Sequence, residues 1–333
     1  MKKLAKNKKG ILLIWFYLLI TVIIIVSGSV YALSFQENRL TNMELAQNQA
    51  FYLAETGIDK MLIQLRTTGA LTSLSGSLGR GTYSSIYDSG TKMVTSTGTV
   101  SGSTKTVRVK VVKSPPVGVR GALTSYGNVS LNGNIIVDGR DYDSNGDLTG
   151  DPGSYGVSAG GSVDQGGSSI IGGNGHEPSD PANSDAYEEF ATMSQFTTPE
   201  EVLGMAPGSL DIYKTATPPA TPFTNQIVYL TGNWQAPDFG TEDAPSTGIL
   251  IVHNSSNDAY LKNVHGWFKG IIIADDLIHI NGDANIIGAA VLQKTTGNAV
   301  GNGAAHVNFS SEVLGNLPIA NYAVVAWEDA QNQ

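Results

Sequence analysis

The residues best suited to chemistry in this 333-residue chain lie in one acidic segment, residues 141–149. Oxygen-bearing side chains at alternating positions, with a glycine at the sixth, are typical of the first half of a calcium-binding loop. Gly146 holds that turn position, but Pro152 stands where the final bidentate glutamate would be. The segment predicts a structural calcium site, with a solvated Asx-rich turn as the alternative. Its ligands would be Asp141, Asp143, Asn145, the Asp147 carbonyl and Thr149.

Catalytic constellations are much weaker in this sequence. Hydrolysis of a glycosidic bond needs two carboxylates that face each other across a cleft, for which Asp275, Asp276 and Asp283 are the candidates. Aspartates are also expected at turns, where they bond to the backbone. No nucleophile elbow, P-loop or dinucleotide fingerprint occurs in a suitable context, so the sequence predicts a protein that is not an enzyme. The five histidines lack metal-ligand spacing: His176, His253, His265, His279 and His306.

Composition narrows the class of protein further. The chain has no cysteine, which excludes disulfides, thiolate metal sites and cysteine nucleophiles. It has 39 glycines and only 15% charged residues, which favours short strands joined by many turns. The net charge is −9, and the basic residues concentrate at the start of the chain. An acidic body of this kind predicts no nucleic-acid partner.

The amino-terminal segment has the pattern of a membrane anchor. Residues 1–10 contain five lysines and no acid, and residues 11–35 contain no charged residue. About 20 apolar residues in a helix span a bilayer, and lysines on one side place that end in the cytoplasm. We therefore expect a basic leader at 1–10 and a transmembrane helix at 11–35.

The helical pattern continues beyond the apolar run. Apolar residues recur every three or four positions from Leu40 and Met43 to Leu65, and Thr67-Thr68-Gly69 ends the pattern. This predicts an amphipathic half at 36–69, continuous with the membrane half. The alternative is a cleaved secretory signal, for which Val30-Tyr31-Ala32 would be an acceptable site.

Two segments of this helix resemble type IV pilus minor pilins of the PilX type. They are KNKKG followed by the apolar run, and the residues QAFYLAETGI at 49–58. The resemblance implies cleavage by prepilin peptidase after Gly10, a mature chain that starts at Ile11, and later packing against other pilin subunits. The family usually has glutamate five residues after the cut, whereas this chain has Trp15. That departure implies a tip or initiating subunit, because a glutamate there pairs with the neighbouring amino terminus.

The remainder of the chain reads as β-structure in two parts. Residues 70–80 read as a loop, and strands then follow at 81–88, 92–100 and 105–113, separated by hairpin turns at 88–90 and 101–103. This predicts an antiparallel meander at 70–114, packed on the amphipathic helix. After Pro115-Pro116 the strands become very short, with Gly and Asn at their ends. This pattern of short strands predicts a parallel β-helix or solenoid at 115–333, with an ordinary β-sandwich as the alternative.

Residues 175–247 interrupt that pattern of short strands. They contain several prolines and two helical patterns, at 184–195 and from Pro199 onward, and therefore predict an insertion. Residues 301–314 and Trp327-Glu328 resemble the closing part of PilX-type ectodomains. Trp234, Trp267 and Phe268 fit either a surface for sugars or the core.

The fold class predicted is α+β, and two functions fit it. The first is a minor pilin that primes a filament or displays a tip domain for adhesion. Its partners would be other pilins, the bacterial inner membrane, prepilin peptidase, and a surface carbohydrate or host ligand. The second is a secreted or anchored β-helical protein that binds or cleaves carbohydrate. The mature amino terminus separates them, since a secretory cut would leave Leu33 or a later residue.

Overall fold

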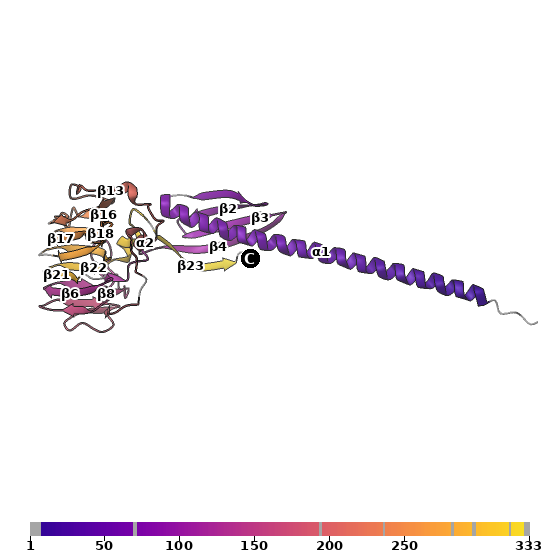
Figure 1. The fold of residues 1–333 in the computed structure, drawn as a ribbon, viewed down its shortest axis with the longest axis horizontal. Coiled ribbons are helices and arrows are strands. Elements are labelled where there is room, and N and C mark those ends of the chain that lie inside the picture. The colour runs from indigo at the N-terminus through magenta and orange to yellow at the C-terminus, as the bar shows by residue number, and fades with distance from the viewer. Residues whose placement is uncertain are drawn as a thin grey trace, which may run out of the picture. The chain divides into compact units, whose positions relative to one another are not determined.

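The computed structural model describes residues 8–68, 72–192, 195–235, 237–280, 283–294, 298–319 and 321–329. The chain divides into two compact units, which we describe separately (Figure 1). Unit 1 contains residues 1–64, 70–111 and 324–333, and unit 2 contains residues 65–69 and 112–323.

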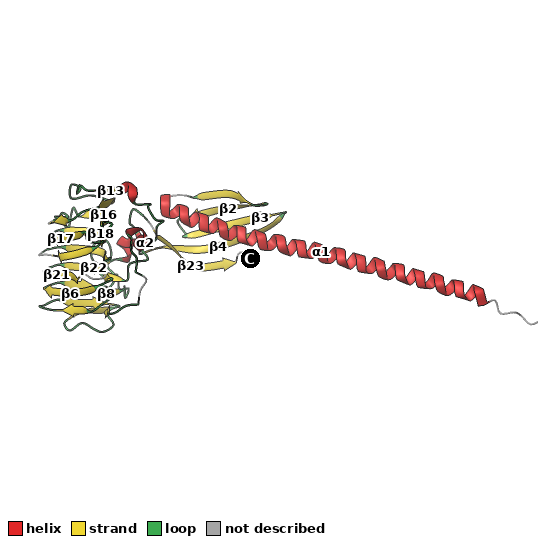
Figure 2. Cartoon of the chain, viewed as in Figure 1, coloured by secondary structure: helices red, strands yellow, loops and turns green. Residues whose placement is uncertain are grey.

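One long helix, α1 (Lys8–Thr68), forms the amino-terminal segment, drawn as a single uninterrupted coil in Figure 2. No proline occurs in it, so no residue interrupts its backbone hydrogen bonds. The hydroxyls of Thr21 and Ser29 donate to the carbonyls of Tyr17 and Ile25, one turn earlier, both at 2.8 Å. These bonds satisfy two of the polar side chains inside the apolar run. The predicted continuous helix is confirmed.

Unit 1 also contains a five-stranded antiparallel sheet in the order β1-β2-β3-β4-β23. The β3–β4 turn, Ser101-Gly102, has φ angles of 48° and 84°, as a two-residue type I′ hairpin requires. The prediction of a loop at 70–80 is wrong where the structure describes it, because residues 73–78 pair with β2 through the backbone. The strands are β1 (Ser73–Leu78), β2 (Gly81–Asp88), β3 (Met93–Val100), β4 (Ser103–Ser114) and β23 (Asn321–Asp329).

The last strand of this sheet corrects a predicted boundary. We expected residues 115–333 to form one solenoid-like domain, but β23 joins the meander beside β4. The sequence offers no local signal for this pairing, since its partner lies about 200 residues earlier in the chain. Unit 2 is therefore inserted between two neighbouring strands of the unit 1 sheet.

Unit 2 is built on two sheets whose strands are almost all parallel, which confirms the α+β class with a solenoid-like part. One sheet has the order β15-β17-β19-β21-β6-β9. The other has the main path β11-β10-β7-β22-β20-β18-β16-β14-β13, with β5, β8 and β12 off that path. Its strands are β5 (Gly121–Ser125), β7 (Ile136–Asp138), β8 (Tyr155–Ala159), β10 (Ile170–Gly173), β11 (His176–Ser179), β12 (Tyr187–Glu188), β13 (Lys214–Thr215), β14 (Gln226–Leu230), β16 (Ser246–Val252), β18 (Trp267–Ala274), β20 (Asn285–Leu292) and β22 (His306–Phe309). Those of the smaller sheet are β6 (Asn128–Gly133), β9 (Val163–Gln165), β15 (Trp234–Gln235), β17 (Tyr260–Val264), β19 (Asp276–Ile280) and β21 (Asn298–Gly303).

The order of the coils in space differs from their order in sequence. The chain enters the middle of the stack at β5 and β6 and winds through β9 and β10 toward one end. It then crosses over and winds back from β14 and β15 at the other end to β21, which pairs with β6 over residues 298–303. In this middle coil, β22 pairs with the first half of β20 and β5 pairs with its second half. Two chain segments far apart in sequence thus complete one coil.

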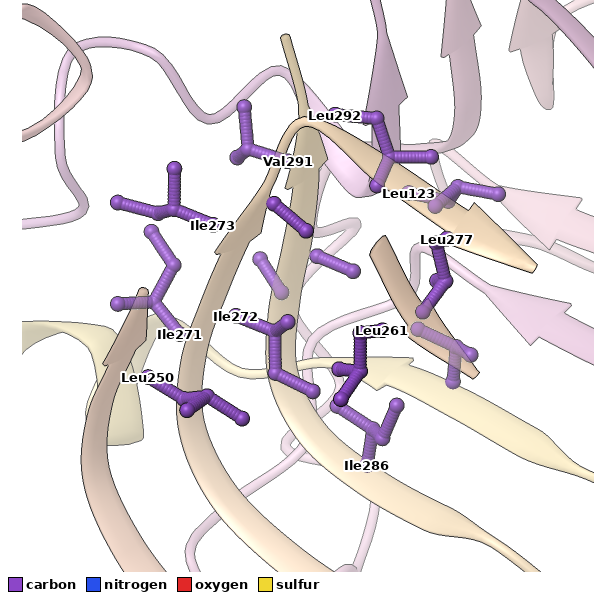
Figure 3. Packing of buried hydrophobic residues seen from close by; sticks show 14 of the residues in the cluster. Leu123, Leu250, Leu261, Ile271, Ile272, Ile273, Leu277, Ile286, Val291 and Leu292 are labelled. Carbon is purple, nitrogen blue, oxygen red and sulfur yellow. The ribbon is translucent and has the colours of Figure 1, made fainter. Parts of the chain in front are cut away.

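Stacked aliphatic side chains form the core of unit 2 (Figure 3). Leu250, Ile272, Ala290 and Leu123 lie in register across four strands, and each is 0% or 1% exposed. Residues 249–252 and 271–274 are buried at every position, which is typical of a sheet covered on both faces. Each coil therefore buries its apolar surface on the next.

The predicted insertion at 175–247 is only partly correct. Residues 226–230 and 234–235 are not inserted but form the first coil of the returning half. The helix predicted at 184–195 is wrong where the structure describes that segment, because Tyr187 and Glu188 instead pair with β8. The second helical pattern is confirmed as α2 (Pro199–Leu203), which has a Thr198–Glu201 capping box. The segment also contains a 3₁₀ turn, η1 (Asp211–Tyr213), and α3 (Ser311–Gly315) follows later.

Candidate functional site

The main candidate site is the exposed apolar surface of α1, residues 13–35, which we call the apolar half. Its residues are all exposed, and Trp15 and Tyr17 remain 67% and 66% exposed. The most apolar stretch of α1 has a mean hydropathy of 2.5, and none of it is buried. At ~1.5 Å per residue the apolar half is roughly 34 Å long, compared with a bilayer core of about 30 Å. Among the described residues, α1 is the one helix long and apolar enough to cross a membrane.

A second stretch, residues 46–61, packs on the unit 1 sheet, and we call it the packed half. Its contact face carries small residues, among them Ala50, Ala54 and Gly57, all buried. They meet small residues of the sheet: a side chain added at Gly57 would collide with Ser96, and one added at Gly98 would collide with the Ala50 carbonyl. The helix therefore lies very close to the sheet.

This close packing gives the segment QAFYLAETGI at 49–58 a structural explanation. Its buried members are Ala50, Leu53, Ala54, Gly57 and Ile58. Under the helix, the Ser85 hydroxyl donates to the Ser96 hydroxyl at 2.9 Å, so these buried polar atoms are paired. The resemblance to pilins on these residues thus coincides with the contact between helix and sheet.

The amphipathic half begins later than predicted. Leu40 and Met43 were expected on the buried face, but they are 59% and 46% exposed, as is Leu45 at 53%. The first helix residue buried on the sheet is Ala46. The exposed part of the helix therefore extends from residue 13 to residue 45, roughly 50 Å at ~1.5 Å per residue, and beyond residue 35 its apolar side chains stand among polar and charged ones. A bilayer about 30 Å thick covers only part of that length.

The predicted processing residues lie at the start of α1. The backbones of Gly10 and Ile11 are in its first turns, and Lys2, Lys3 and Lys6 lie outside the described residues. Cleavage after Gly10 stays a prediction.

The acidic segment forms a tight hairpin whose carboxylates bond to their own chain. Tyr142 and Leu148 form an antiparallel bridge. The Asp143 Oδ1 atom accepts from the backbone of Asn145 and Asp147, at 2.8 and 2.9 Å. These bonds, that from Asp147 above all, hold the pKa of Asp143 below its ordinary value.

The most buried aspartate of this segment caps a distant helix. Asp141 is 4% exposed, and its carboxylate accepts from the Ser311 backbone at 2.7 Å and from the Ser311 hydroxyl at 2.8 Å. The Ser144 backbone in turn donates to Glu312 at 2.9 Å. The segment thereby joins the first half of the stack to α3, the helix that follows the last coil.

Calcium binding by this segment stays a prediction. Within the part of the chain that the structure describes, no group of three or more His, Asp or Glu side chains is arranged to hold a metal ion. Asp141 and Asp143 point to backbone donors, and the Asp147 carbonyl accepts from the Asp143 backbone at 2.8 Å. Only a rearrangement of these bonds would bring the predicted oxygens together.

The three candidate catalytic carboxylates do not form a pair. Asp275 is fully buried, where its carboxylate contacts His253 Nδ1 at 2.6 Å and accepts from the backbones of Asn254 and Ala259. Asp276 binds Lys294 at 3.2 Å, and Asp283 is 80% exposed beside His265. Asp275 and Asp276 therefore bind structural partners, and Asp283 is exposed to solvent.

The other residues singled out from the sequence lie at scattered positions. His176 lies 4.0 Å from Asp185, and burial lowers the pKa of His306. We expected His279 on an outer face, but it has a φ of 60° and a buried Nδ1 atom without a partner among the described residues. Of the aromatic residues, Trp234 and Phe268 belong to the core and Trp267 is partly exposed.

Sequence reasoning missed the ion pair between Arg120 and Glu188. Arg120 Nε and Nη2 donate to the two oxygens of Glu188 at 2.7 and 3.1 Å, and the Ser158 hydroxyl donates at 2.6 Å. Burial alone would raise the pKa of Glu188, but these bonds outweigh it and lower the pKa. The sequence predicts that Glu188 lies in a helix, so nothing local indicates its partner.

Comparison with known proteins adds little to these observations. No protein-family model matches the chain, and no curated protein matches it. Among solved structures, the crystal structure of the competence-associated pilin ComZ from Thermus thermophilus is similar, with 12% identity. The match covers 85% of this chain and 97% of that chain, with a TM-score of 0.22. At that score the likeness carries no argument, so the functional case rests on the residues themselves.

Proposed function

We propose that this chain is a structural subunit of a type IV pilus or a related filament, anchored in a bacterial inner membrane before assembly. One observation carries the proposal. A single helix presents an exposed apolar run at residues 13–35 and continues directly into a stretch packed on an antiparallel sheet. The basic leader and the segment at 49–58 support the same reading.

The length of the exposed surface favours a filament over a simple anchor. Lipid would cover the apolar half, but Leu40, Met43 and Leu45 lie beyond it. Exposed apolar surface of this extent marks an interaction site in a soluble environment. The apolar helices of neighbouring subunits would cover it once the filament forms.

The finer role we propose is that of a minor pilin, of the PilX type, at the tip or at initiation. Trp15 stands where a shaft subunit would carry glutamate to pair with a neighbouring amino terminus. A buried amine without a partner is costly, and a subunit with no neighbour on that side avoids the cost. Unit 2 would then be displayed as an adhesive part.

We also propose that the chain has no enzymatic activity. The buried Asp275, the Lys294-bound Asp276 and the exposed Asp283 support this, because none is available as one of two facing carboxylates. A carbohydrate-cleaving role is therefore the weaker alternative.

Amino-terminal sequencing of the mature protein from membranes tests the proposal. We expect the chain to start at Ile11, and to start at Met1 when Gly10→Glu blocks the cut. Deletion of the gene should also reduce surface filaments. A mature start at Leu33 or later would mean that the apolar half is discarded, and the filament proposal would fail.

A further inference from the structure

Unit 2 contains a polar pocket that none of the roles above uses. It has a volume of about 390 Å³ and lies between the loop after β16, the segment before α2 and the end of β20. Its volume is within the range of about 300–1,000 Å³ typical of small-molecule sites. The lining residues used below are Gln195, Phe196, Ser256, Asn257, Asp258 and Lys294.

Hydrogen bonds from neighbouring residues hold the walls of this pocket in place. The Asp275 carboxylate accepts from the backbones of Asn254 and Ala259, at 3.1 and 3.0 Å, so it fixes both ends of the loop that carries Asn257. On the other side, Gln293 Nε2 donates to the Phe196 carbonyl at 3.0 Å. A site whose walls are already ordered loses less entropy when it binds a ligand.

Several polar groups of the pocket have no partner in the described part of the chain. The side chains of Gln195, Ser256 and Asn257 are exposed and make no hydrogen bond there. Gln293 also lines the pocket but is 5% exposed, and its Nε2 atom is already bonded to Phe196. The three exposed side chains are therefore free to bond to a ligand.

The charge of the pocket favours a neutral ligand. Lys294 is paired with Asp276 at 3.2 Å, whereas Asp258 accepts from the neutral Asn254 amide at 2.7 Å and keeps its negative charge, so the pocket offers an anionic ligand no unpaired cation. What remains is a set of amides and a hydroxyl, with the ring of Phe196 alongside.

We propose that this pocket binds a neutral saccharide. Amide and hydroxyl groups match the hydroxyls of a sugar, and an aromatic ring packs on its apolar face. This inference deepens the proposed function, since it names what the displayed unit would hold, but the pocket does not depend on the filament.

Saturation-transfer NMR on the full chain in a sugar-free detergent tests the site. The probes are glucose, galactose, mannose and N-acetylglucosamine, with sialic acid and a sulfated sugar as charged competitors. We expect saturation of at least one neutral sugar and at least tenfold weaker binding for Asn257→Gly. Phe196→Leu, which keeps an apolar side chain, should weaken binding in the same direction.

Asn225→Gly is the matched control. Asn225 and Asn257 are both exposed, with φ angles of 50° and 52°, so glycine suits either backbone. Absence of saturation for every neutral sugar, preference for the charged probes, or equal effects of the two asparagine variants would each overturn the proposal. A mature chain that starts at Leu33 but still binds sugar would remove the filament role and leave the pocket standing.

Discussion

The two β-regions of this protein achieve their strand order by different means. In unit 1, β1 to β4 are neighbours in sequence and in space, and short turns join them. In unit 2, the middle coil combines β5 with β22, which lie about 180 residues apart. The short turns therefore account for most of the strand order in unit 1. In unit 2, the strand order depends on the stacking of side chains and glycines from segments far apart in the sequence.

The largest effect should come from the glycine column of the stack. Gly248, Gly270 and Gly288 lie in register with φ angles of 128°, 154° and 136°. A side chain at Gly270 would collide with the Gly248 carbonyl and would be strained in this conformation. We expect Gly270→Val to destabilise unit 2 by about 3–5 kcal/mol, measured by denaturant unfolding.

Gly232→Ala is the control for this column, because nothing lies within 4 Å of an added Cβ there. It should change the free energy of unfolding by less than about 0.5 kcal/mol. Similar losses for the two variants would mean that the stack does not depend on the column.

The contact between helix and sheet in unit 1 should be nearly as sensitive. Gly57→Leu places a large side chain against Ser96 and Ser85, where the helix lies closest to the sheet. We expect a loss of about 2–3 kcal/mol and faster proteolysis of the helix. Lys60→Leu places the same leucine side chain at an exposed position of the same helix and should have little effect.

The link between the two halves of the stack should be weaker. Asp141→Ala removes a buried carboxylate that accepts two hydrogen bonds from Ser311. We expect a loss of about 1–2 kcal/mol, as for a helix cap, and faster hydrogen exchange in α3.

Asp143→Ala serves as the comparison, since this carboxylate bonds mainly within its own hairpin. Its smaller effect would separate the long-range link from the local turn. The same pair tests the calcium prediction: bound calcium would raise the melting temperature of the wild type but of neither variant.

The smallest effect should come from Glu188, and it should depend on pH. Its pKa is lowered in the folded state, so the stabilisation is present above the ordinary carboxyl pKa of about 4.3 and is lost as the pH falls through the lowered value. Glu188→Gln should cost about 1 kcal/mol at pH 7, discounted for the partial exposure of Arg120. Urea unfolding between pH 3 and pH 7 measures the difference, which should vanish at the acid end. Glu242→Gln, at an exposed loop position, should show no such trend.

Part of the candidate site was predictable from the sequence and part was not. The apolar half and the end of the helix near Thr68 follow from composition and period, which need no distant partner. The exposure of Leu40 and Met43 does not, because it depends on where the sheet ends. The pocket around Gln293 was also unpredictable, since its walls come from segments about 40 to 100 residues apart.

The sequence by itself determined the features that a few neighbouring residues can encode. These are the long helix, the type I′ turn at Ser101-Gly102, the α2 capping box and the short-strand texture of unit 2. Tertiary structure alone decided that β23 returns to the meander, that Glu188 lies in a strand opposite Arg120, and that Asp141 caps α3. The physical reason is that these features depend on partners tens to hundreds of residues away, and only the folded chain brings such partners together.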